Sequence, residues 1–268
     1  MKNIFSIVIL VLALMHIGCN STASKQAEIQ NPEKSEKADS TFSAFENTFL
    51  DAYWRQHPSA AIQVGYGKYY ENLNIPDSNG FKALVSFSKS WIDSLNSLHY
   101  DQLSDNNKIS YNILKNQLES DIWYISVFKQ QEWDASIYNL SADCDYIINQ
   151  PYAHLAERLR ILSGHLQHSD DYYRAALATL NRPTKEHIEL AILQNEGGLS
   201  LFGSALNDSI KASHLNADEV KTLQQNIGRT KEAIQHFVEV LKGIVANKKA
   251  EYRDFRIGKK LFTEKFKF

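Results

Sequence analysis

Apolar residues recur at intervals of three and four residues along most of this 268-residue chain. The first set lies within 41–57, a predicted helix that Pro58 ends. Its members are Phe42, Phe45, Phe49 and Tyr53. The same spacing predicts further helices over 81–98, 104–125, 151–164, 169–180, 183–210 and 216–247. The pattern therefore predicts a mainly α-helical fold, an antiparallel multi-helix bundle-like domain with no substantial sheet.

Local signals add detail to this pattern. Ser104 or Asp105 is suited to cap the third helix, and Pro151 to stand in the first turn of the fourth. Gly197 and Gly198 predict an interruption within 183–210. Two segments lack helical spacing: 60–75, which contains Gly65 and Gly67, and 131–148, which is irregular and rich in aromatic residues.

The N-terminus has the features of an export signal. Lys2 precedes a short apolar run over 4–14, and Gly18-Cys19 follows it, as in the signal peptide of a bacterial lipoprotein. We therefore interpret 1–18 as a lipoprotein-type signal peptide and Cys19 as the lipidation site that attaches the protein to a membrane. His16 stands where such signals usually carry Leu, which leaves cleavage without lipidation open. The predicted location is the periplasmic side of a bacterial membrane, although the sequence does not separate it from the cell surface.

Residues 19–40 hold one large apolar residue, Ile29, among polar ones, and we expect a flexible tether there. The remaining residues, 41–268, form the predicted helical domain.

Composition narrows the possible partners. The chain has 29 basic and 31 acidic residues, a net charge of −2, and no basic stripe that would indicate nucleic acid. If Cys19 carries lipid, Cys144 has no partner for a disulfide, and we interpret it as a buried thiol.

No catalytic constellation stands out, so we assign no catalytic residue, no metal ligand and no cofactor to this chain. The candidate metal ligands are His165 with His168, His154 with Glu157, Glu186 with His187, and Asp143 with Asp145. Each is a pair, whereas a catalytic zinc needs three protein ligands and an open position. We therefore interpret them as ordinary polar neighbours.

Aromatic residues are dense between 123 and 152. They are Trp123, Tyr124, Trp133, Tyr138, Tyr146 and Tyr152. They could line a pocket for a peptide or a sugar, but we favour a role in the core.

Four segments, in order, resemble one family. They are 57–65 (HPSAAIQVG), similar to Pro-x-x-Ala-Thr-x-x-Gly with Ala61 in place of Thr; 103–114 (LSDNNKISYNIL), similar to Leu-Ser followed by Tyr-x-x-Leu; 151–162 (PYAHLAERLRIL); and 254–262 (DFRIGKKLF). This order is similar to the N-terminal half of the domain-of-unknown-function 885 (DUF885) family, exported bacterial proteins that look like zinc metallopeptidases.

The resemblance implies zinc for the full-length family, but the half with its His-Glu-x-x-x-His and Gly-Trp-x-x-Tyr-x-Glu segments is missing here. We therefore expect a non-catalytic part that packs beside a C-terminal catalytic half and helps to shape a cleft for a peptide substrate. The alternatives are a stand-alone lipid-anchored binding or scaffold domain, with 123–152 as its surface, and a split product without activity of its own.

The last residues continue the apolar pattern, with six large apolar side chains between 255 and 268. We expect the chain to be truncated at its C-terminus. We also expect 250–268 to pack poorly on the rest of the chain and to meet a C-terminal half.

The targeting signal yields a first prediction. Cys19→Ser removes the thiol that takes the lipid, so the variant is expected to leave the membrane fraction that holds the wild-type protein. Fractionation under high salt measures this. Full retention of the variant with membranes would show that lipid at this residue is not the anchor.

Overall fold

The computed structural model describes residues 32–268, in which helices are joined by turns and loops and no strand occurs. The helices are α2 (Pro32–Gln56), α3 (Pro58–Gln63), α4 (Ser78–Asn96), α5 (Asp105–Trp123), α6 (Gln130–Trp133), α7 (Ser141–Asn149), α8 (Leu155–His165), α9 (Ser169–Thr179), α10 (Lys185–Gly198), α11 (Ser204–Ala212), α12 (Ala217–Ala246) and α13 (Gly258–Lys265). Four short helical turns join them: η1 (Tyr100–Gln102), η2 (Tyr124–Phe128), η3 (Ala135–Ile137) and η4 (Leu199–Phe202). The predicted mainly α-helical fold is confirmed.

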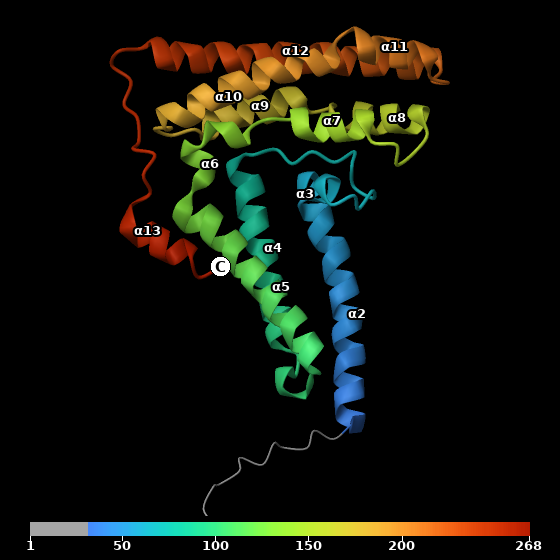
Figure 1. Cartoon of the computed structure of the whole chain (residues 1–268), viewed down its shortest axis with the longest axis vertical. Helices are drawn as coiled ribbons and strands as arrows, with labels where there is room; N and C mark the ends of the chain where they lie inside the picture. Colours follow the sequence, from blue (N-terminus) through green and yellow to red (C-terminus); the bar gives the residue numbers. More distant parts are fainter. Residues whose placement is uncertain (1–31) are drawn as a thin grey trace, which may run out of the picture.

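The helices form two groups. α2, α4 and α5 run lengthwise as a stalk, and α7 to α12 lie across one end of it (Figure 1). The short α3 lies where the two groups meet, and α13 lies beside α5 and α6. None of the helices in the described part of the chain combines the length and the apolar character needed to span a bilayer.

Side-chain caps begin two helices where the sequence predicted. Ser104 Oγ accepts the backbone N–H of Asn107 at the start of α5. At the start of α12, the Asn216 side chain accepts the Glu219 N–H at 2.9 Å, and the Glu219 carboxylate accepts the Asn216 N–H at 2.8 Å. Such caps contribute about 1 kcal/mol each by satisfying N–H groups that the helix leaves free.

The start of α2 corrects one prediction. This helix begins at Pro32, so residues 32–40, which we assigned to a flexible tether, are its first turns. Lys, Glu and Ala in this stretch favour helix intrinsically, and Phe42, which follows at once, is fully buried. The helix therefore continues outward from a buried residue. Residues 1–31, with the predicted signal peptide, the lipidation site and most of the tether, lie outside the described residues.

The start of α8 corrects another. We expected Pro151 in the first turn, but the helix begins at Leu155 with His154 in extended backbone before it. Arg158 explains the difference, because its guanidinium donates to the carbonyl oxygens of Ala153 (3.1 Å) and Ile148. These bonds tie the connection down in a non-helical path.

The stalk is held together by an aromatic ladder on α2. The rings of Phe42, Phe45, Phe49 and Tyr53 follow one another with centroids 5.4–6.2 Å apart, on the face that the spacing predicted. Trp91 of α4 packs edge-on against Phe49 at 5.2 Å. Because fully burying such a side chain contributes roughly 1.5–3 kcal/mol, the ladder is the main force that holds α2 against α4 and α5.

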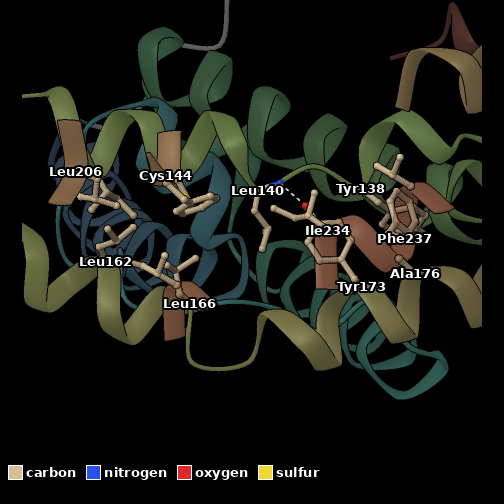
Figure 2. Packing of buried hydrophobic residues seen from close by; sticks show 14 of the residues in the cluster. Tyr138, Leu140, Cys144, Leu162, Leu166, Tyr173, Ala176, Leu206, Ile234 and Phe237 are labelled. Carbon is tan, nitrogen blue, oxygen red and sulfur yellow. Dashed lines mark hydrogen bonds between the residues drawn. The ribbon is translucent and has the colours of Figure 1, made fainter. Parts of the chain in front are cut away.

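A larger core fills the space between the crossing helices. α12 contributes Leu223, Ile234, Phe237 and Leu241 to it, all almost fully buried. Figure 2 shows Tyr138, Leu140 and Tyr173 meeting Ile234 and Phe237, with the Tyr173 hydroxyl accepting the N–H of Leu140. Cys144 lies in the same core, and burial raises the pKa of its thiol. The interpretation of Cys144 as a buried thiol is confirmed.

One amide joins three elements inside this core. The buried Asn195 side chain accepts from the Tyr173 hydroxyl at 2.7 Å and donates to the carbonyl oxygens of Tyr138 (3.1 Å) and Ala191 (2.9 Å). All of these groups are satisfied by one another, so the network fixes how α9 and α10 meet the loop before α7.

A buried histidine stands at the break between α2 and α3. The His57 ring stacks on Tyr53 with centroids 4.2 Å apart, and Nε2 lies 3.8 Å from Asp121 Oδ2 of α5. Neither of these two atoms has a hydrogen-bond partner within residues 32–268. Burial lowers the pKa of His57 from 6.5 to about 4, so the ring is neutral at physiological pH.

The free energy of unfolding should therefore fall on acidification. As the pH drops below 6.5, His57 becomes protonated in the unfolded chain, whereas in the folded chain it becomes protonated only at about pH 4. The loss reaches about 2 kcal/mol by about pH 5. Burial lowers the pKa of His165 too, which adds a loss of the same sign.

Urea unfolding of wild type and His57→Phe at about pH 7 and pH 5 measures this effect, because Phe keeps the stacking and removes the titrating group. The variant is expected to lose less stability between the two pH values. An equal loss in both proteins would show that His57 takes no part.

Candidate functional site

The side of the molecule near α13 is organised by an irregular turn. α5 runs into the π-helical turn η2, whose last bond is donated by the Lys129 N–H to the Tyr124 oxygen at 2.8 Å. Lys129 adopts left-handed backbone, with φ of 53°. A π-helical turn widens the helix by one residue, and such turns are frequent at functional sites. Here the wider turn brings aromatic side chains on both sides of it together.

Three of those side chains form a buried aromatic cluster: Trp123, Phe128 and Trp133. Trp123 stacks on Phe128, and Phe128 meets Trp133 edge-on, both with centroids 5.1 Å apart. The Trp133 indole donates to the Phe128 carbonyl oxygen at 3.0 Å. Tyr138 is buried as well. The preference for a core role of the aromatics between 123 and 152 is confirmed for Trp123, Trp133 and Tyr138.

The C-terminal segment 250–268, which we call the strap, covers this cluster. It leaves the end of α12 and runs down the side of the molecule to α13 (Figure 1). Gly258 begins α13 with φ of 78°, a left-handed conformation that glycine adopts without strain. Ile257 and Leu261 pack on the cluster, and Glu264 accepts the Trp123 indole N–H at 3.2 Å.

Two cations of the strap also lie over aromatic rings. The Arg253 guanidinium is 4.8 Å from the centre of the Trp133 ring, and the Lys265 ammonium is 5.5 Å from that of Phe128. The inner side of 250–268 thus contacts the rest of the chain, although none of its side chains is fully buried, so our expectation of poor packing holds only in part. The cluster provides an apolar surface at the right place, which sequence spacing alone does not indicate.

The outer side of α13 differs from the inner side. Phe262 and Phe266 stand one turn apart with ring centroids 4.8 Å from each other, and they are 54% and 75% exposed. Phe255, just before the helix, is 47% exposed. We call these three residues the outer aromatic face. Neighbouring exposed aromatic side chains are typical of a surface that meets another part of a protein.

A groove of about 770 Å³ adjoins the other side of η2. Its walls come from α4, with Phe81 and Val85, and from α9, with Ala175 and Ala178. η2, Lys129 and α6 line it as well, together with polar residues at α4 and α9 such as Asp77 and Asn181. A backbone hydrogen bond joins two sides of the groove: the Asn181 N–H, just after α9, donates to the Glu132 carbonyl oxygen of α6 at 2.6 Å. The groove is thus apolar along its sides and held by backbone hydrogen bonds.

The histidine candidates for metal binding do not converge. His165 is fully buried, and its Nδ1 lies 3.0 and 3.1 Å from the carbonyl oxygens of Tyr70 and Asn72. Since both partners are acceptors, Nδ1 carries the hydrogen and donates it. His168 is exposed beside Asp171 instead. His165 is a structural residue that ties the 64–77 connection to α8.

The remaining candidates also separate. His187 begins α10, where its ring contacts the Thr184 hydroxyl and Trp133. The Asp143 carboxylate accepts from Gln63 at 3.2 Å, whereas Asp145 accepts from Asn149. Within residues 32–268, no three His, Cys, Asp or Glu side chains come together in a way that could hold a metal ion.

Comparisons with known proteins place this fold. The model of a family described as "Bacterial protein of unknown function (DUF885)" matches residues 58–268. The chain belongs to this family. The resemblance to the DUF885 family is therefore confirmed. No curated protein matches the sequence.

A solved structure is similar to this DUF885 chain. It is described as "a putative lipoprotein of unknown function" from Shewanella oneidensis, is 34% identical, and superposes with a TM-score of 0.80. The match covers 84% of this chain and 41% of the relative. The chain thus spans about two fifths of that protein, and the relative's description agrees with the lipoprotein-type signal.

The strap yields a local prediction. Leu261→Ala removes a side chain that packs on the aromatic cluster and should cost about 1–2 kcal/mol of local stability. Amide hydrogen exchange over 257–266 should then speed up about tenfold, while α12 stays protected. Phe262→Ala, the neighbouring change on the outer side, is the control and should leave the exchange unchanged. Equal acceleration by both would mean that α13 is not held by its inner side.

Proposed function

We propose that this chain is the non-catalytic N-terminal helical part of an exported, membrane-anchored, zinc-peptidase-like protein. In this proposal the outer aromatic face packs against further polypeptide of the same protein, which carries the catalytic residues. The groove between α4 and α9 forms one wall of the cleft that receives a peptide. The lipid on Cys19 holds the protein at the periplasmic side of a bacterial membrane.

One observation carries the proposal: the outer aromatic face of a helix whose inner side is already packed. Phe262 and Phe266 are more than half exposed, and each would contribute roughly 1.5–3 kcal/mol if it were buried. The Shewanella relative extends well beyond the region that this chain matches. Further chain of that kind is the occupant that the proposal assigns to this face.

The groove supports the peptide part of the proposal. Apolar walls from Phe81, Val85 and Ala178 suit the side chains of an extended peptide, and Lys82 at the same groove provides a cation. The zinc implied by the family resemblance has no set of ligands among residues 32–268. The proposal therefore assigns the metal and the peptide cleavage to the further polypeptide.

The outer aromatic face can be tested in the full-length protein. Phe262→Ser with Phe266→Ser should lower its melting temperature, because the variant loses aromatic burial against the rest of the protein. In the 268-residue chain alone the same pair should change the melting temperature little. Thermal unfolding followed by circular dichroism gives both values.

Ile109→Ser with Ile113→Ser is the matched control. These two residues are also one turn apart, on α5, and are 60% and 62% exposed. The control should be neutral in both proteins. If the phenylalanine pair is neutral in the full-length protein as well, the outer aromatic face is not an internal interface. A stand-alone lipid-anchored binding or scaffold domain would then be the better description.

A further inference from the structure

The far end of the stalk contains a small cavity lined by two lysines. It has a volume of about 460 Å³ and lies between the first turns of α2 and the connection from α4 to α5. Lys34 and Lys37 line it from α2, and His99 and Gln102 line it from the connection. Leu98 and Leu103 provide an apolar side.

Neither lysine has a carboxylate partner among the described side chains. Within the described part of the chain the two ammonium groups have no ion-pair or hydrogen-bond partner, and no carboxylate lines the cavity. Of the acids close to the lining residues in sequence, which are Glu36, Asp39 and Asp101, Asp39 is turned toward α5, where its carboxylate accepts the Ser104 N–H at 2.9 Å. The lining thus includes two ammonium groups with no described partner, an imidazole and an amide beside an apolar wall.

The position of the cavity relates it to the membrane. Figure 1 shows the start of α2 and the connection between α4 and α5 at the same end of the stalk, away from α7 to α12. Only residues 20–31 separate Cys19 from Pro32. Even a fully extended chain of that length reaches about 45 Å, so a lipid on Cys19 keeps the start of α2 within about that distance of the bilayer.

We propose that the cavity binds the phosphate of an anionic lipid headgroup in the bilayer that carries the protein. Lys34 and Lys37 supply the charge, the Gln102 amide supplies a neutral donor, and the apolar wall formed by Leu98 contacts the glycerol part of the lipid. An anionic membrane surface attracts basic side chains close to it. The inference rests on the membrane attachment in the proposed function and adds a second contact, which orients the stalk.

The test uses the lipidated protein reconstituted into vesicles. Amide exchange over 34–41 and 99–103 is compared between vesicles of phosphatidylcholine alone and vesicles that also contain phosphatidylglycerol. Exchange should slow about tenfold or more on the anionic vesicles, and high salt should remove the effect. Lys34→Gln with Lys37→Gln should abolish the protection.

Two further variants separate the cavity from general attraction. Lys248→Gln with Lys249→Gln makes the same change of charge on exposed residues at the other end of the molecule and should keep the protection. Ser97→Phe fills the mouth of the cavity with all charges unchanged and should remove it.

Several outcomes would overturn the inference. The first is equal exchange rates of the wild-type protein on both kinds of vesicle, and the second is an equal loss of protection in the two double-lysine variants. The third is undiminished protection of Ser97→Phe on anionic vesicles. The fourth is that inorganic phosphate on neutral vesicles protects the wild-type protein as well as the anionic lipid does. Co-flotation of the protein with the vesicles measures membrane attachment separately from headgroup binding. If the wild-type protein does not float with them, the membrane attachment in the proposed function is itself wrong.

Discussion

The arrangement of the molecule depends on one buried side of α12. This helix has 30 residues and carries a row of buried side chains along its length, which α8, α9 and α10 cover. Because α9 is packed against α12, it is held in place as a wall of the groove. The end of α12 at Ala246 also determines where the strap begins. The two features that we connect with function are thus positioned by the same apolar contact.

The stalk depends on a different kind of contact. Aromatic rings hold α2 against α4, and the helix breaks at His57 on the chain's way to the crossing helices. His165 secures the next connection by donating to the Tyr70 and Asn72 carbonyl oxygens from inside the core. Two buried imidazoles therefore stand where the two groups of helices meet. Burial favours the neutral form of both rings, so protonation at acid pH should weaken the junction.

Much of this fold follows from the sequence because it is local. The aromatic ladder on α2 and the caps at Ser104 and Asn216 depend on residues within a few positions of one another, and periodicity describes them. The start of α8 is not local, because Arg158 withdraws the residues after Pro151 from the helix. The π-helical turn η2 was missed for a related reason. The aromatic rings on both sides of it contact the strap, more than a hundred residues away in the sequence, and local periodicity does not indicate such a contact.

The strap shows how little periodicity says about partners. Ile257 and Leu261 are four residues apart, as are Phe262 and Phe266. Their spacing therefore does not predict which pair is buried and which is exposed. The aromatic cluster separates them, because it can cover only one side of α13. A helix of eight residues is not stable by itself in water, so the inner contact explains why it forms. That contact does not explain Phe262 and Phe266 on the opposite side, because both remain exposed and so add no burial energy in this chain. It is this exposed pair that our proposal places against further polypeptide.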